Sequence, residues 1–289
     1  MVLRPPGLRV LSASASRLAV WGDPIAHSRS PRLHRAAYGV LGLDWTYDAA
    51  QVGEPSFGAA LGRLDATWRG LSLTYPLKGA AFGAADVRDR PAELTGAVNT
   101  LLLTGDTPCG FNTDVGGIVR ALGDEGIHEV GRARVVGAGA TAGSAMAALA
   151  ELGTRSIEVV ARRAESVRPL AELGERLGVA VTAAGLHDAS HPPADVTIAA
   201  LPGDAAVPDA AADALAGSGG FLLDVVYGHW PTAISAAWDR AGERSTSGLG
   251  MLVHQALLQV RIFVAGEPGV PLDDEAAVLA AMRGAVVGD

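Results

Sequence analysis

The residue best suited to acid-base chemistry is notable because its type occurs only once in the chain. Lys78, in the stretch SLTYPLKGA, is the single lysine among 289 residues, whereas arginine occurs 22 times. A guanidinium stays protonated at any working pH, but a lysine amine can release and take back a proton. A codon bias toward Arg, Ala and Gly explains why lysines are few, but it does not explain why the remaining one lies here.

The surroundings of Lys78 favour a role in proton transfer. Pro76 predicts the start of a helix, which places Lys78 in a first turn, where a positive charge opposes the helix dipole. A carboxylate that could act with the lysine is Asp114 in GFNTDVGG, just before a helix predicted over residues 115–126. Considered alone, Asp114 fits an N-cap and a catalytic partner about equally well.

Two serines in the stretch GDPIAHSRSPRLH suit the binding of a carboxylate. Pro31 fits the first position of a helix, which makes Ser30 a natural N-cap. Ser28 has no such capping role, and two hydroxyls beside a helix N-terminus favour an anionic ligand. His27 and His34 have no partner at ligand spacing, so we interpret both as structural.

The stretch VVGAGATAG indicates a dinucleotide cofactor. Gly137 and Gly139 follow a predicted strand and precede a predicted helix, and Ala142 is an allowed variant at the third position of the motif. A glycine turn can also be merely structural, but the following strand supports cofactor binding. That strand ends in Arg162 and Arg163, where NAD sites usually have an acidic residue, so the sequence favours NADP.

Composition excludes several other classes of protein. The net charge of -8 and the lack of a basic block argue against nucleic acid or an anionic membrane as a partner. Cys109 is the only cysteine, which excludes an intrachain disulfide and suits a reducing cytoplasm. His187 and His191 are four residues apart but have no third ligand nearby, so we predict no metal site. We expect a cytoplasmic monomer or homodimer.

Short apolar runs alternate with helical stretches from residue 18 onward, which predicts an α/β fold with mainly parallel sheets. The pattern restarts near residue 114, so we expect two domains. The predicted parts are a substrate-binding domain over residues 1–113, with a flexible leader at 1–17, a Rossmann-like NADP domain over 114–247, and C-terminal helices over 248–289 that pack back on the first domain.

Seven motifs occur in the order and approximate spacing found in shikimate dehydrogenases. They are GDPIAHSRSPRLH, LTYPLK, GAVNT, FNTD, the glycine turn, DVVYGHWPT and GLGMLVHQA, between residue 18 and about residue 265. The chain therefore resembles this family. The resemblance implies a substrate domain that faces an NADP domain across a cleft. It also implies the reversible reduction of 3-dehydroshikimate to shikimate, in the biosynthesis of aromatic amino acids.

The resemblance further implies a role for each residue that matches a family motif. Lys78 and Asp114 are the implied catalytic pair. The residues implied to bind the substrate carboxylate are Ser28, Ser30 and Tyr227, and those implied to contact ring hydroxyls are Thr74, Asn99 and Gln255. The implied cofactor residues are Gly137, Ala138, Gly139, Ala140 and Thr141 at the pyrophosphate, Arg162 and Arg163 at the 2′-phosphate, and Val225 and Gly248 near the nicotinamide.

Three departures from the family pattern leave alternatives open. Ser72 stands where the family often has Asn, Ala161 stands where it commonly has Asn, and the apolar residues 200–202 replace a more polar loop near the nicotinamide. The short Ser72 could admit an extra or exchanged ring group, so a quinate or aminoshikimate dehydrogenase is the nearest alternative. A non-catalytic shikimate-binding regulator is another. The presence of both Lys78 and Asp114 argues against a regulator.

Overall fold

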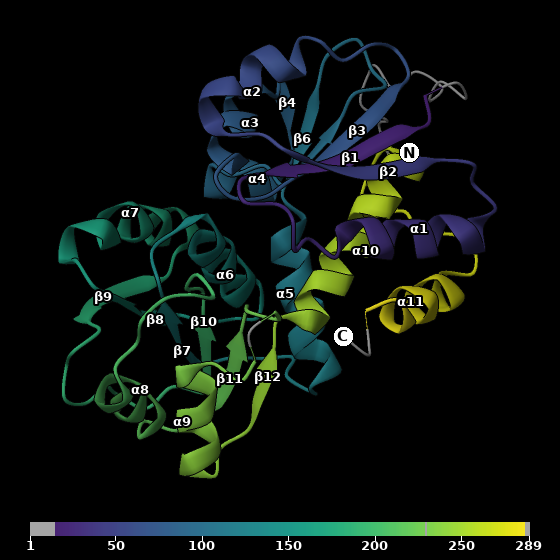
Figure 1. Ribbon diagram of the computed structural model, residues 1–289. Coiled ribbons are helices and arrows are strands. Elements are labelled where there is room, and N and C mark those ends of the chain that lie inside the picture. The colour runs from purple at the N-terminus through teal and green to yellow at the C-terminus, as the bar shows by residue number, and fades with distance from the viewer. Residues whose placement is uncertain (1–14, 229, 287–289) are drawn as a thin grey trace, which may run out of the picture. The chain divides into compact units, whose positions relative to one another are not determined.

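The computed structural model describes residues 15–228 and 230–286, which form an α/β protein with two six-stranded sheets (Figure 1). The chain divides into two compact units. One unit holds the residues up to Thr113 together with those from Val253 onward, and the other holds Asp114–Leu252. The C-terminal helix α11 (Glu275–Gly284) packs on α1 (Ser30–Leu41). These features confirm the predicted fold class.

The first unit contains a mixed sheet with the strand order β2-β1-β3-β5-β6-β4. Strand β1 is parallel to both β2 and β3, whereas β5 is antiparallel to β3 and to β6. The strands are β1 (Arg17–Gly22), β2 (Thr46–Gln51), β3 (Trp68–Leu73), β4 (Val87–Arg88), β5 (Thr100–Leu102) and β6 (Cys109–Phe111). The remaining helices of this unit are α2 (Glu54–Leu61), α3 (Lys78–Ala84), α4 (Arg90–Thr95) and most of α10 (Leu249–Ala265).

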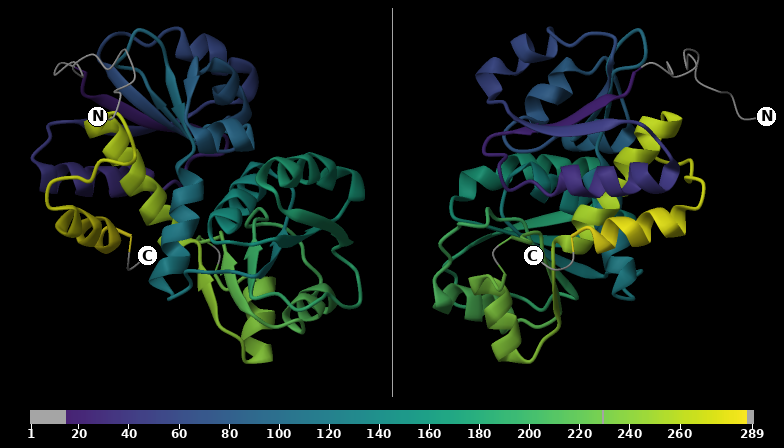
Figure 2. Two further views of the ribbon diagram at one scale, coloured as in Figure 1. Left: turned by 180° about the vertical axis from the view of Figure 1, so that it is seen from behind. Right: turned by 45° about the vertical axis from the view of Figure 1, so that its right-hand side comes forward.

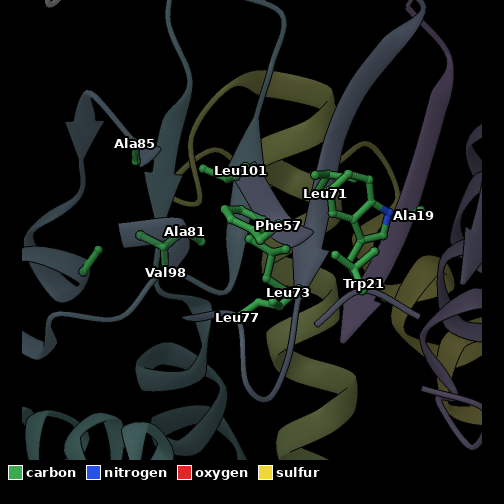
Figure 3. Packing of buried hydrophobic residues seen from close by; sticks show 12 residues of the cluster. Ala19, Trp21, Phe57, Leu71, Leu73, Leu77, Ala81, Ala85, Val98 and Leu101 are labelled. Atoms are coloured by element: carbon green, nitrogen blue, oxygen red, sulfur yellow. The ribbon is translucent and has the colours of Figure 1, made fainter. Parts of the chain in front are cut away.

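The apolar core of the first unit lies on one face of its sheet. Leu71 and Leu73 alternate along β3 and are both buried against Phe57 of α2 and Ala81 of α3 (Figure 3). Side chains two residues apart on a strand point to the same face, so these leucines face α2 and α3 together. Burial of this face fixes the register of β3, so the side chain of Ser72, between the two leucines, points to the opposite face of the sheet.

Helix α10 covers the opposite face of the same strand. A Cβ atom on Gly70 would lie only 2.5 Å from the ring of Phe263, so glycine lets this helix approach the sheet closely. Ser72 points to the same side and donates a hydrogen bond to the Oε1 atom of Gln259, at 2.7 Å. Figure 2 shows α10 crossing this unit beside its sheet. The sheet therefore has an apolar face toward α2 and α3 and a partly polar face toward α10.

The second unit contains an all-parallel sheet with the strand order β12-β11-β10-β7-β8-β9. Read from β9, this is the 3-2-1-4-5-6 order of dinucleotide-binding sheets. The strands are β7 (Arg132–Val136), β8 (Ser156–Ala161), β9 (Ala180–Gly185), β10 (Val196–Ala199), β11 (Phe221–Asp224) and β12 (Ser245–Ser247). The helices are α5 (Thr113–Asp124), α6 (Ala140–Glu151), η1 (Ala164–Val167), α7 (Arg168–Leu177), α8 (Asp209–Ala216) and α9 (Ala233–Ala241).

Several predictions about the ends of the chain and its segments can be compared with the structure. Residues 1–14 of the expected leader lie outside the described residues, whereas the Ala15 carbonyl accepts a hydrogen bond from Arg69 at 2.7 Å, and β1 begins at Arg17. Helix α10 is continuous, so it begins in the second unit and ends in the first. No helix in the described part of the chain has the length and apolar character needed to cross a membrane.

Candidate active site

Two predicted site residues lie just beyond the carboxyl end of β3. Thr74 directly follows this strand, and its N–H donates to the Trp21 carbonyl of β1 at 3.0 Å. A Cβ atom on Gly22 would lie only 2.3 Å from Cγ2 of Thr74, so glycine at this position leaves room for the threonine side chain. The Thr74 carbonyl then accepts the N–H of Leu77, and α3 begins at Lys78. The turn between strand and helix therefore holds Thr74 and Lys78 close together, with both side chains partly exposed.

Asn99 joins this group through the backbone and through its side chain. The Lys78 carbonyl accepts the N–H of Val98 at 3.0 Å, and the Asn99 carbonyl accepts the N–H of Leu73 at 2.8 Å. The Asn99 side chain accepts the Thr113 N–H at Oδ1 and donates from Nδ2 to the Thr113 hydroxyl, each at 2.9 Å. The structure thus brings Lys78 and Asn99 together within the first unit.

Asp114 follows Thr113 directly and is buried, with 4% of its surface exposed. It lies inside the first turn of α5, which begins at Thr113, so the interpretation of Asp114 as an N-cap is wrong. A carboxylate in the first turn of a helix interacts favourably with the helix dipole. Its position is fixed from one side because Thr113 is held by Asn99.

Asp89 supports the same segment from the other side. Its Oδ1 accepts the N–H of Ala92 at 2.8 Å, which caps α4, and also the N–H of Asn112 at 3.2 Å. Burial raises the pKa of Asp89 to about 6, although both N–H donors favour the ionised form. Sequence reasoning missed this residue, because Asp before Arg-Pro predicts a helix cap and gives no sign of a second, distant donor.

The local roles of the two serines differ from those predicted. Helix α1 begins at Ser30 itself, with Arg29 at the cap position, so the prediction of Ser30 as N-cap is wrong. Pro31 lies at one of the first two helical positions, and the Ser28 hydroxyl accepts the N–H of Ser30 at 3.4 Å. The Ser30 side chain is instead hydrogen-bonded with Tyr47. Ser28 and Ser30 are therefore neighbours at the start of α1, with Ser28 partly exposed and Ser30 buried.

Gln255 lies on α10 and is buried. One turn further along the same helix is Gln259, which sequence reasoning missed and which bonds to Ser72, His34, Thr100 and the Asn99 carbonyl. Residues four apart share one face of a helix, so Gln255 lies on the face that Gln259 anchors to the sheet. No local motif indicates the partners of Gln259, because Ser72 and Asn99 lie far away in the chain.

In the second unit, the glycine turn occupies the point where strand order reverses in the sheet. Gly137 follows β7 with φ at +119°, and a Cβ there would lie 2.6 Å from the Ala200 carbonyl, so only glycine fits. Gly139 is the cap residue of α6 and has no side chain to satisfy the first N–H groups. The turn residues Ala138, Ala140 and Thr141 are at least partly exposed. This is a suitable cradle for a pyrophosphate.

The two predicted arginines lie next to this turn. The Gly137 N–H donates to the carbonyl of Val160, near the end of β8, at 2.8 Å. Arg162 and Arg163 follow that strand, and both are exposed. The Arg163 carbonyl accepts the N–H and the hydroxyl of Ser166, which fixes the backbone there. Two exposed guanidiniums beside a pyrophosphate cradle fit the 2′-phosphate of NADP.

Val225 and Gly248 are also brought together. A Cβ on Gly248 would lie 2.0 Å from the Val225 carbonyl oxygen, so glycine is required for this close approach. The loop that begins at Val225 is held by buried Asp224, which accepts the Val226 N–H at 3.1 Å and the Thr232 hydroxyl at 2.6 Å. Burial raises the pKa of this aspartate, against both hydrogen bonds. Tyr227 lies on the same loop and is partly exposed.

Of the four histidines that sequence reasoning considered, His27 and His187 are exposed, and His34 and His191 are buried. His34 is fully buried, and burial lowers its pKa to about 3, so it is neutral and structural as predicted. Nδ1 of His191 lies 3.3 Å from Oε1 of Glu158. Within residues 15–228 and 230–286, the structure has no group of three or more His, Cys, Asp or Glu side chains that could hold a metal.

Comparisons with known proteins give the family. Residues 20–101 match the family model described as the shikimate dehydrogenase substrate binding domain. A shikimate dehydrogenase (NADP(+)) of Methylobacterium radiotolerans is 35% identical over 271 residues, which cover 86% of this chain and 90% of the relative.

Solved structures agree with this result. The shikimate dehydrogenase of Mycobacterium tuberculosis is 39% identical with a TM-score of 0.81, and the match covers 93% of this chain and 99% of that one. The shikimate 5-dehydrogenase of Thermus thermophilus, solved in complex with NADP(H) and shikimate, is 31% identical with a TM-score of 0.76, over 94% and 100% of the two chains. The expectation drawn from the seven motifs is confirmed: the chain belongs to the shikimate dehydrogenase family.

Proposed function

We propose that the protein is a shikimate dehydrogenase that uses NADP to reduce 3-dehydroshikimate reversibly to shikimate, on the route to chorismate and the aromatic amino acids. It is an oxidoreductase that acts on a CH–OH group. Similarity over most of the chain to relatives with this name supports the assignment. The structural observation that carries it is the placement of the only lysine beside Asn99, in the unit that contains the substrate-domain match.

We assign the binding and protonation of the substrate to the following residues. Ser28 and Ser30 bind the carboxylate together with Tyr227, and the ring hydroxyls meet Thr74, Asn99 and Gln255. Lys78 stabilises the negative charge that develops on the carbonyl oxygen during reduction and protonates that oxygen, while Asp114 orients the ammonium.

The second unit binds the cofactor. Residues 137–141 hold the pyrophosphate, Arg162 and Arg163 hold the 2′-phosphate, and Val225 and Gly248 border the nicotinamide. When bound, NADPH supplies the hydride. We further propose that the protein works in the cytoplasm, as a monomer or homodimer, since its single cysteine suits a reducing compartment.

Replacement of the lysine tests the proposal. Lys78→Arg keeps a positive charge but cannot release a proton near neutral pH, so kcat for shikimate oxidation should fall about 100-fold or more, nearly as far as in Lys78→Ala. The Kd for NADP, measured by calorimetry, should stay near the wild-type value. Arg240→Lys, at an exposed pair with Asp213, is the control and should leave kcat unchanged. If Lys78→Arg retains most of the turnover, the proton-transfer role is wrong.

A further inference from the structure

The side chain of Gln259 is the centre of a buried hydrogen-bond network in the first unit. Its Oε1 accepts from the Ser72 hydroxyl at 2.7 Å and lies 3.2 Å from Nε2 of His34. Its Nε2 donates to the Thr100 hydroxyl at 3.1 Å and to the Asn99 carbonyl at 3.2 Å. An amide has two acceptor positions and two N–H groups, so these four partners use all of them and fix its orientation.

The directions of the surrounding hydrogen bonds agree with this orientation. His34 is neutral because burial lowers its pKa to about 3, and it must donate from Nε2 because the amide oxygen only accepts. Its Nδ1 therefore accepts from the Tyr38 hydroxyl, 3.2 Å away. Tyr47 donates to Ser72 at 2.6 Å, which leaves the Ser72 proton for Gln259. The direction of each hydrogen bond around Gln259 is therefore defined.

The network ends at residues assigned above to the substrate. Thr100 accepts from Gln259 and donates to Oδ1 of Asn99 at 2.8 Å, so the oxygen of the Asn99 amide is turned toward Thr100 and Thr113. At the opposite end, Tyr47 joins Ser72 to Ser30. Gln259 thereby connects the carboxylate-binding side of the site to the side that contacts ring hydroxyls.

The geometry of the sheet suggests why this amide comes from a helix. Ser72 and Thr100 are directly opposite each other in the antiparallel pair of β3 and β5. An Asn at position 72, the residue common in the family, would carry an amide across to Thr100 from the strand itself, since opposed Cβ atoms lie about 5 Å apart. Ser72 is too short to do this, and Gln259 reaches the same hydroxyl from α10.

We propose that Gln259 is a positioning residue for substrate binding, which supplies from α10 the carboxamide that Ser72 lacks and thereby orients Asn99. This inference rests on the proposed function, because Asn99 is a substrate contact only if that function is correct. It also bears on specificity. The space that a short residue at 72 would leave for an extra ring group is occupied by the Gln259 side chain, which is buried with Ser72.

A double-mutant cycle tests the proposal. Gln259→Ala removes the amide, so Asn99 should lose one or two of its hydrogen bonds to shikimate. At about 1 kcal/mol for each bond, the shikimate Kd should rise roughly 5- to 30-fold. The Kd is measured by calorimetry without cofactor. Ser72→Asn alone forces extra atoms against Gln259 and should also weaken binding and lower Tm. In the double variant the Asn amide takes the place of the Gln amide, so Kd and KM should return to within about threefold of wild type.

Thr154→Val controls for stability alone, since it removes a buried hydrogen bond to the Val130 carbonyl in the other unit and should lower Tm without changing the shikimate Kd. If the increase in the shikimate Kd of the double variant equals the product of the two single increases, the proposal is wrong. It is also wrong if Gln259→Ala lowers Tm but leaves the shikimate Kd unchanged. Failure of the wild-type protein to bind or oxidise shikimate would instead overturn the proposed function.

Discussion

Asp89 should make the stability of the protein depend on pH in an unusual direction. Ionisation of most carboxylates stabilises the folded protein, but burial raises the pKa of Asp89 from 3.8 to about 6. The folded state therefore holds this proton more tightly than the unfolded chain does. The contribution is favourable below about pH 4, is lost as the pH rises from about 4 to about 6, and is absent above that window. A rise of about two pKa units corresponds to roughly 3 kcal/mol.

The variant Asp89→Asn isolates this contribution. Asn keeps an oxygen that can accept from the Ala92 and Asn112 N–H groups, and it is a good N-cap, but it does not titrate. We therefore expect the free energy of unfolding of the variant, measured in urea, to increase relative to that of the wild type between pH 4.5 and 6.5. Above this range the difference between the two proteins should stay constant. Asp65→Asn is the matched control.

The control has the opposite electrostatic character. Asp65 is exposed, and hydrogen bonds from the Thr67 hydroxyl and N–H lower its pKa, so it stays ionised across the whole window. The free energy of unfolding of Asp65→Asn should differ from that of the wild type by a constant amount between pH 4.5 and 7.5. A constant difference for Asp89→Asn as well would show that Asp89 titrates normally, and the argument from its burial would be refuted.

Two further predictions concern ligand binding. Replacing both Arg162 and Arg163 with Ala should raise the KM for NADP much more than the KM for NAD, because only NADP carries the 2′-phosphate; equal losses for both cofactors would contradict the assignment. Ser28→Ala should raise the shikimate KM and, since its hydroxyl only weakly supports the Ser30 N–H at 3.4 Å, change Tm by little; an unchanged KM would show that the carboxylate does not meet Ser28.

The sequence predicted the fold because the alternation of strands and helices is a local signal. Alternation of strands and helices predicted the parallel sheet of the second unit. Lys78 was singled out by its type and by its position after Pro76, and its catalytic role stays a prediction. Helix starts were less predictable, because Pro31 is compatible with a start at Ser30 or one residue later, and α1 begins at Ser30.

The supporting residues could not be predicted, because their contacts connect segments that are far apart in the chain. Gln259 is 187 residues from Ser72 and 160 residues from Asn99, and only the approach of α10 to β3 brings them together. Asp89 similarly reaches Asn112 over 23 residues. No periodicity or local motif encodes such pairs, so they emerge only once the topology is known.

This difference changes how the departure at position 72 is interpreted. From the sequence, Ser in place of Asn indicated a site with room for an extra or exchanged ring group. In the structure, the Ser72 hydroxyl accepts from Tyr47 and donates to Gln259, with 3% of the residue exposed, so its proton is already used within the protein. On the proposal made for Gln259, positions 72 and 259 act together, because the amide that completes the network comes from one of them or from the other. A substitution at either position should be judged together with the other, because its effect on substrate binding depends on which side chain supplies the amide.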